Sequence, residues 1–227
     1  DFIQHLLDRW VDSLPRAHGK NKPRRIRNAV ARKGMNSNDK PRITGLIEPL
    51  VTGLGPDNRI EVTLRKAVRA DAYGLVELVK SVSAEKVYIT PEEYPYSPET
   101  EGQFLVQAWK NGSARFVADH EGRVVGECSI FRELEPKRAH TAECQLLVLR
   151  EYRRMGLGRA LMNYAEKWAR DAKILKLHLR VFATNRAAAA LYESLGYEIE
   201  GTLKGQVRVN DDFADEYIMT KFINPVP

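Results

Sequence analysis

Residues 141–168 read TAECQLLVLREYRRMGLGRALMNYAEKW, and three kinds of local structure follow one another within them. Gln145 to Leu149 is apolar and too short for a helix of its own, which favours a strand. Arg150 to Met155 is polar and basic. The apolar residues beyond it recur at helical spacing, which predicts a helix with one buried face: Leu157, Ala160, Leu161, Tyr164, Ala165 and Trp168.

The turn between the predicted strand and helix is typical of an anion site and reads Arg153-Arg154-Met155-Gly156-Leu157-Gly158. Its two glycines allow a close bend and the approach of a ligand. Unpaired N–H groups and the positive end of the helix dipole favour a phosphate there. Several arginines add charge around it, namely Arg150, Arg153, Arg154 and Arg159. The turn alone is equally compatible with a glycine-relieved bend and solvated arginines.

Two common phosphate motifs do not fit this turn. A dinucleotide fingerprint requires a third glycine where Leu161 stands, and the chain has no Gly-Lys-Ser/Thr of a P-loop. A second motif follows instead at residues 185–197, NRAAAALYESLGY. Together the two motifs resemble the GNAT superfamily of N-acetyltransferases, with Arg-x-x-Gly-x-Gly followed by Asn-x-x-Ala-x-x-Leu-Tyr-x-x-x-Gly-Phe. Tyr197 replaces the final Phe, and the resemblance extends from about Ile60 to Ile223.

This resemblance implies an enzyme that moves an acetyl group from acetyl-CoA to a primary amine by direct attack in a ternary complex. The amine is a small molecule, such as an amino acid or polyamine, or a protein amine. The resemblance places the cofactor phosphates on Arg153, Arg154, Met155, Gly156, Leu157, Gly158 and Arg159. It places the pantetheine arm on backbone groups of Leu147, Val148 and Leu149, as an added strand. Asn185, also a helix N-cap candidate, would bond the same arm.

The resemblance makes Tyr192 the general acid, and a phenol suits this role because it stays protonated at neutral pH. Glu143 is the candidate base, because some relatives use a glutamate near this position of the central strand. Other relatives carry it on the following strand, where Arg180 stands here. Glu127, His140 and a water chain remain alternatives, and Glu143 as a solvated or ion-paired strand residue is the competing interpretation.

The acceptor pocket is expected between two loops, Tyr88 to Pro98 and Gly205 to Phe213, since the resemblance builds it there. The first loop holds acidic and aromatic residues that suit a cationic amine and suit an exposed loop equally well: Glu92, Glu93, Tyr94 and Tyr96.

The predicted fold is α+β, a mixed and mostly antiparallel sheet flanked by helices and splayed where the central strand parts from the next. Residues 59–227 form this domain, and residues 1–58 form an extension with a short helix, Asp1 to Leu14, and a basic linker. Irregular chain is predicted for Ile43 to Leu54. The predicted strands are Ile60–Val68, Ala114–His120, Arg123–Arg132, Ala139–Leu149, Ile174–Phe182, Glu198–Arg208 and Phe213–Phe222, and the helices are Ala70–Ser83, Glu99–Asn111, Leu157–Asp171 and Arg186–Leu195.

Charge is concentrated in the extension. Residues 16–42 hold ten Lys and Arg against one Asp, a net +9, so the rest of the chain carries −3 of the total +6. Weak contact with nucleic acid or the ribosome is one interpretation. A solvated tether is favoured, because no aromatic residue interleaves these charges. An acyl-CoA-binding regulator and a nucleic-acid adaptor therefore stay open as alternatives to the enzyme.

Composition leads to expectations about membrane association, cellular location and metal binding. The chain of 227 residues has no apolar run near membrane-spanning length and no secretory start, so we expect no membrane partner. Its only cysteines, Cys128 and Cys144, lie in predicted strands and favour reduced thiols and a cytoplasmic location. Five scattered histidines predict no metal site. A homodimer is left open.

Overall fold

The computed structural model describes residues 43–47, 60–90 and 93–225, with side chains from residue 60 onward. Arg42 to Pro227 forms one compact unit. The predictions for the short N-terminal helix and for the basic segment 16–42 lie outside the described residues. The predicted domain boundary, after residue 58, also falls outside them.

The described residues form one sheet with helices on both faces. Its strands are β1 (Ile43–Ile47), β2 (Ile60–Lys66), β3 (Ala114–His120), β4 (Arg123–Arg132), β5 (Thr141–Val148), β6 (Lys176–Phe182), β7 (Glu198–Val209) and β8 (Asp212–Phe222). The spatial order is β1-β2-β3-β4-β5-β6-β8-β7. Neighbours run antiparallel except β5 and β6, which are parallel. This confirms the predicted mixed, mostly antiparallel sheet.

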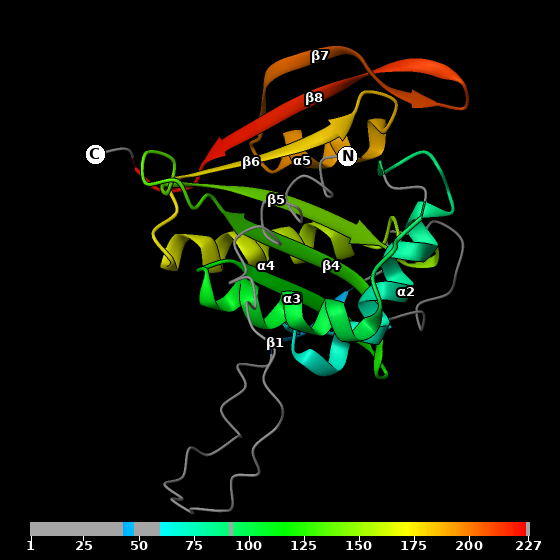
Figure 1. Cartoon of the computed structure of the whole chain (residues 1–227), viewed down its shortest axis with the longest axis vertical. Coiled ribbons are helices and arrows are strands. Elements are labelled where there is room, and N and C mark those ends of the chain that lie inside the picture. Colours follow the sequence, from blue (N-terminus) through cyan, green and yellow to red (C-terminus); the bar gives the residue numbers. More distant parts are fainter. Residues whose placement is uncertain (1–42, 48–59, 91–92, 226–227) are drawn as a thin grey trace, which may run out of the picture. The chain divides into compact units, whose positions relative to one another are not determined.

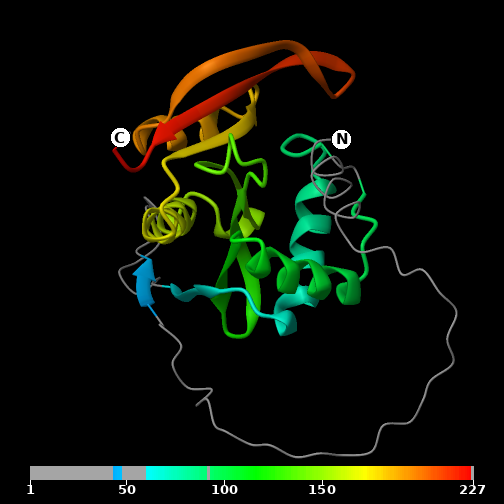
Figure 2. The ribbon, with the colours of Figure 1, turned by 60° about the vertical axis from the view of Figure 1, so that its left-hand side comes forward.

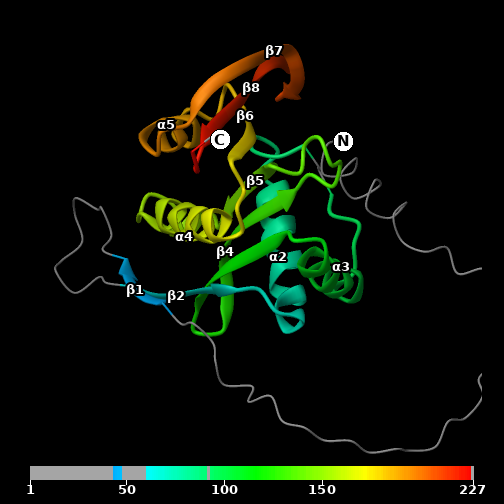
Figure 3. The same cartoon turned by 90° about the vertical axis from the view of Figure 1, so that its left-hand side faces the viewer.

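The helices form one layer on each side of the sheet, as Figure 3 shows. They are α2 (Ala72–Ser83), α3 (Pro98–Lys110), α4 (Leu157–Asp171) and α5 (Arg186–Ser194), with short 3₁₀ turns η1 (Arg69–Asp71) and η2 (Arg150–Tyr152). A Cβ on Gly74 of α2 would meet Val124 of β4, and a Cβ on Gly126 would meet Leu161 of α4. The register between β3 and β4 shifts between Ala118↔Gly126 and Asp119↔Val124, and such a bulge breaks the usual alternation of faces. Gly126 therefore faces α4 and lets this helix approach the sheet closely.

One sequence prediction is wrong. Irregular chain is predicted for Ile43 to Leu54, but its first five residues form β1 and pair with β2 from Ile43↔Leu64 to Ile47↔Ile60. Without this partner, β2 would be the sheet edge and would leave a row of N–H and C=O groups unpaired. Strand pairing therefore overrides the weak strand propensity of Gly45.

Two tight hairpins connect neighbouring strands, as predicted. Glu121 and Gly122 join β3 to β4 with φ of 51° and 84°, and Asn210 and Asp211 join β7 to β8 with φ of 51° and 67°. Positive φ at both central residues matches the twist of the flanking strands, and Asn, Asp and Gly tolerate it best.

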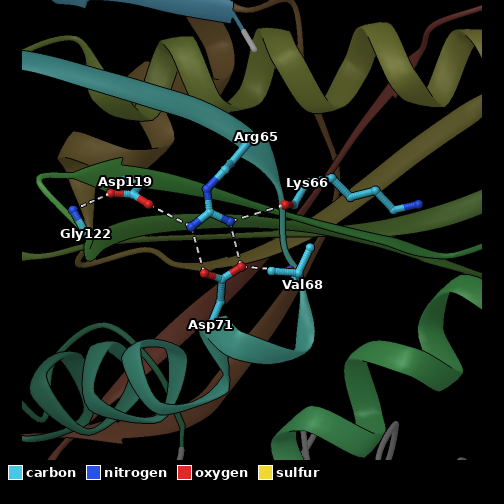
Figure 4. Close-up of polar contacts among 6 residues, drawn as sticks. All are labelled: Arg65, Lys66, Val68, Asp71, Asp119 and Gly122. Atoms are coloured by element: carbon cyan, nitrogen blue, oxygen red, sulfur yellow. Dashed lines mark hydrogen bonds and ion pairs between the residues drawn. The ribbon is translucent and has the colours of Figure 1, made fainter. Parts of the chain in front are cut away.

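A group of charged side chains braces the start of α2 (Figure 4). The guanidinium of Arg65 on β2 donates to both oxygens of Asp71 and to Asp119 of β3, each at 2.7 Å. Asp71 also accepts the Val68 N–H, and Asp119 accepts the Gly122 N–H, both at 2.7 Å. The brace therefore fixes the direction in which α2 leaves the sheet and holds the β3–β4 hairpin against β2.

Candidate active site

β5 and β6 separate in the middle of the sheet, as predicted (Figures 1 and 2). Their parallel pairing runs only from Thr141↔Lys176 to Glu143↔His178. β5 continues along β4 as far as Val148↔Gly126. From Cys144 to Val148, β5 therefore has an unpaired edge on the side of β6, which an extended ligand can use.

The backbone hydrogen bonds between β4 and β5 indicate which residues of β5 direct their backbone groups to this open edge. The Leu149 N–H donates to the Val125 carbonyl at 3.0 Å, on the β4 side. In an antiparallel pair the bonding direction alternates from residue to residue, so the backbone groups of Leu147 also point to β4. Those of Leu146 and Val148 point to the open edge. Of the predicted arm-binding positions Leu147, Val148 and Leu149, only Val148 thus presents its backbone there.

The turn after β5 presents a concave row of N–H groups. Arg154 and Gly156 have φ of 63° and 83°, and α4 starts after them. After Arg153, the next N–H group that donates a backbone hydrogen bond is that of Ala160, to the Gly156 carbonyl at 3.0 Å. Among the described residues, none accepts a backbone bond from the N–H groups of 154–159. Successive free N–H groups around left-handed residues form an anion-binding nest.

The two glycines of the turn have different roles. Gly156 requires glycine for its left-handed conformation. Gly158 is expected to let a ligand approach, but a Cβ there would meet Leu191 at 3.2 Å and Leu146 at 3.3 Å. Gly158 thus serves the close packing of α4 on α5 and β5.

The turn arginines divide into bonded and unbonded side chains. Arg153 donates from Nε to the Val148 carbonyl at 2.9 Å and from both Nη groups to Glu85, at 2.9 and 2.5 Å. Exposed Arg159 donates to the Ser194 hydroxyl at 2.6 Å. Arg150 and Arg154 are exposed, with no bond to another described side chain. Sequence reasoning missed Glu85, because its 68-residue separation from Arg153 leaves no local signal.

Tyr192 and Asn185 lie on α5 beside the split. Tyr192 is buried, and its hydroxyl makes no hydrogen bond within the described part of the chain. Burial, with smaller effects of Cys144 and Cys128, raises the pKa of Tyr192 well above its usual value. The phenol is therefore a permanent, unused proton donor at neutral pH. Asn185 is the N-cap, as predicted, and accepts the Ala188 N–H at 3.2 Å through Oδ1.

Glu143 stands where the β5–β6 pairing ends. The side chain is buried, and Oε1 accepts from the Gln145 amide at 3.3 Å. Burial raises the pKa of Glu143 to about 8, opposed by this hydrogen bond and by the charge of Arg180. Cys144 contacts Met162 of α4 at 3.5 Å, so strand alternation turns Glu143 to the face that carries α2 and α3.

The alternative bases are placed less favourably. Glu127 is buried in a network in which one oxygen accepts from Arg115 and from Ser129, each at 2.5 Å. Arg115 also bonds Glu101 of α3. This network ties α3 to β3 and β4. His140 is exposed before β5 begins, and Arg180, at the other glutamate position, pairs with Glu216 at 3.2 Å.

A small apolar cluster lies beside the two loops that are expected to enclose the acceptor. The cluster consists of Phe182 of β6 with Val209 and Ala214 of the β7–β8 hairpin. Val87, which directly precedes the expected loop Tyr88 to Pro98, packs against this cluster, and so does Val207. Tyr94 and Tyr96 anchor the loop from within: the Tyr94 hydroxyl donates to Glu101 at 2.5 Å, and Tyr96 stacks edge-on with Phe104. Glu93 is exposed, and Glu92 lies outside the described residues.

Three further features relate to the predictions from composition: the two cysteines, membrane-spanning segments and metal-binding groups. Cys128 and Cys144 are free thiols with their sulfurs 3.6 Å apart. No described helix has the length and apolar character needed to cross a membrane. In the ranges with described side chains, no group of three or more His, Cys, Asp or Glu residues could hold a metal ion.

Comparisons with known proteins agree on one family. The model of the "Acetyltransferase (GNAT) family" matches residues 84–197. The Escherichia coli L-amino acid N-acetyltransferase AaaT is 28% identical over 166 residues, which cover 71% of this chain and 98% of that protein. A ribosomal-protein-alanine N-acetyltransferase from Brucella melitensis superposes with a TM-score of 0.64 at 30% identity, covering 70% of this chain and 98% of the other.

A third comparison concerns a bound ligand. A GNAT superfamily phosphinothricin acetyltransferase from Sinorhizobium meliloti, solved in complex with acetyl-CoA, shares the fold with a TM-score of 0.65 at 23% identity. The alignment covers 71% of this chain and 88% of that one. Given the match of the family model over half of its residues and the split sheet above, the chain belongs to the GNAT family of acetyltransferases.

Proposed function

We propose that this protein transfers an acetyl group from acetyl-CoA to a primary amine. The observation that carries the proposal is the open edge of β5, which is followed in the chain by the N–H nest at 154–159, whose donors are unused. The Tyr192 hydroxyl is a further donor without a partner among the described residues. The nest suits the cofactor phosphates. The Leu146 and Val148 backbone suits the amides of the pantetheine arm. Arg154 and Arg159 would supply charge, and the Asn185 side-chain amide lies at the start of α5 to bond the arm.

Each chemical step has a candidate group. Glu143 accepts one proton from the ammonium form of the acceptor and so frees the amine lone pair, because a carboxylate with a pKa of about 8 is a competent base near neutral pH. The amine nitrogen then bonds to the thioester carbonyl carbon, and the Val148 N–H stabilises the negative oxygen. The carbon–sulfur bond breaks, the nitrogen of the new amide releases its second proton to solvent, and the Tyr192 hydroxyl donates its proton to the leaving thiolate. A proton then passes through solvent from the Glu143 carboxyl to the Tyr192 phenolate, which restores both groups.

The acceptor class rests on relatives of two kinds. AaaT is named for L-amino acids, and the Brucella protein for an alanine of a ribosomal protein. Both names describe α-amino groups. We infer that an α-amino group, of an amino acid or of a peptide N-terminus, is the acceptor.

The test is release of free thiol from acetyl-CoA in the presence of single amines. The panel contains amino acids, short peptides with free N-termini, the same peptides with blocked N-termini and an internal lysine, and polyamines. We expect thiol release with amino acids or free N-termini and none with blocked peptides. Release with polyamines or lysine alone would contradict the α-amino proposal, and acetyl-CoA binding without turnover on any amine would favour an acyl-CoA-binding regulator.

A further inference from the structure

The Arg153 side chain joins two segments that are far apart in the sequence. Its Nε bonds Val148 at the open edge of β5, and its two Nη groups hold both oxygens of Glu85. The guanidinium carbon also lies 4.6 Å from the ring centre of Tyr88. Glu85 and Tyr88 belong to the α2–α3 loop, of which residues 84–90 and 93–97 are described. Arg153 thus bridges the cofactor strand and the loop expected to wall the acceptor.

These contacts leave the guanidinium little capacity for a phosphate. Arginine has five N–H donors in one plane, and a bidentate carboxylate together with a carbonyl takes three of them. The pair is also largely shielded, since the side chains of Arg153 and Glu85 are 25% and 19% exposed. Arg154, one residue further, is exposed and makes no bond within the described residues. Arg153 is therefore occupied by contacts within the protein, whereas Arg154 is available to a ligand.

We propose that Arg153 is a positioning residue that sets the α2–α3 loop against the open edge of β5 and thereby controls acceptor binding. This inference rests on the proposed acetyl transfer for its kinetic consequence. The loop is held at one point by Val87, which packs on the cluster of Phe182, Val209 and Ala214, and at a second by Tyr94 on Glu101. The Glu85–Arg153 pair holds its first residues, next to Val148. Loss of the pair releases the wall of the acceptor space while the N–H nest stays intact.

Charge removal at Glu85 separates this role from phosphate binding. Glu85→Gln keeps the shape of the side chain and removes its charge. If Arg153 positions the loop, the variant raises KM for the amine by about fivefold or more, as loss of a shielded, charge-assisted pair does. The Kd for acetyl-CoA changes by less than about twofold. If Arg153 is a phosphate ligand held back by Glu85, the same variant frees it and tightens acetyl-CoA binding.

Arg153→Lys and a matched variant complete the kinetic test. A lysine cannot bond Glu85 bidentately and Val148 together, so Arg153→Lys raises KM for the amine like Glu85→Gln, and the double variant is no worse than either single variant. Arg154→Gln, in the same turn, weakens acetyl-CoA and leaves the affinity for S-acetylpantetheine, which has no phosphate, unchanged. A selective loss of acetyl-CoA over S-acetylpantetheine in Arg153→Lys would overturn the proposal.

Amide hydrogen exchange of the full chain tests the bridge without turnover. Glu85→Gln and Arg153→Lys should speed exchange in residues 84–90 of the free protein, and Arg154→Gln should not. Unchanged exchange in both bridge variants would overturn the inference, whatever the activity. If no amine is acetylated but exchange rises as expected, the proposed function fails while the bridge stands.

Discussion

At the scale of single residues, Tyr192 carries the sharpest chemical claim. Its side chain is buried on α5, burial raises the pKa of the phenol, and the hydroxyl makes no hydrogen bond to described groups. Tyr192→Phe keeps the ring that packs on Tyr197, 6.0 Å away between centroids, and removes only the proton donor. We expect kcat to fall by about 10²-fold or more, the usual effect of losing a general acid, and Kd for acetyl-CoA to change little. Near-normal kcat would assign the proton to water instead.

Glu143 leads to a prediction about pH. A base must be deprotonated to act, and the pKa of Glu143 lies at about 8, above the usual value of a carboxyl because of burial. We therefore expect kcat/KM to rise with pH through about 8 and to level off above it. Glu143→Gln should lower kcat and remove this limb, leaving only the titration of the amine. Because an α-amino group also titrates at about 8, acceptors with different amine pKa values are compared: the limb that remains in Glu143→Gln should move with the pKa of the amine. A limb that stays at about pH 8 for every acceptor in Glu143→Gln would exclude this carboxyl as the base.

At the scale of elements, the turn between β5 and α4 depends on a left-handed Gly156. Gly156→Ala places a Cβ at φ of 83°, which costs about 1–2 kcal/mol, and it should weaken acetyl-CoA because the nest must shift. Gly122→Ala is the matched control, with φ of 84°, nothing within 4 Å of the added Cβ and a position in the β3–β4 hairpin.

Both glycine variants should lower the melting temperature by a few degrees, since about 1 kcal/mol corresponds to such a shift. Only Gly156→Ala should also raise Kd for acetyl-CoA in calorimetry. Equal cofactor affinity in the two variants would show that the nest does not hold the phosphates.

At the scale of the whole molecule, Arg42 to Pro227 forms one compact unit that contains β1 and both motifs. A chain that begins at Arg42 should fold and bind acetyl-CoA like the full chain. A chain that begins at Asn58 lacks β1 and exposes the β2 edge, so we expect a lower melting temperature and concentration-dependent association. Equal stability and solubility of the two chains would mean that β1 contributes nothing to the sheet.

The sequence predicts elements well where local physics decides. Apolar periodicity defines α4, the Asn210-Asp211 and Glu121-Gly122 pairs define hairpins, and the side chain of Asn185 caps α5 as expected. It fails for Ile43–Ile47, where glycine and a short apolar run resemble loop chemistry, because β1 exists only through its pairing with β2.

For the candidate site, the sequence alone determined the family resemblance, the glycine-containing turn, Asn185 and Tyr192, since each depends on residue types at close spacing. Only the tertiary structure decided which backbone groups face the open edge of β5, that Gly158 serves packing, and that Arg153 bonds Glu85. It also decided the burial that raises the pKa of Glu143. The physical reason is that these properties arise between segments tens of residues apart, which meet only when the sheet has formed.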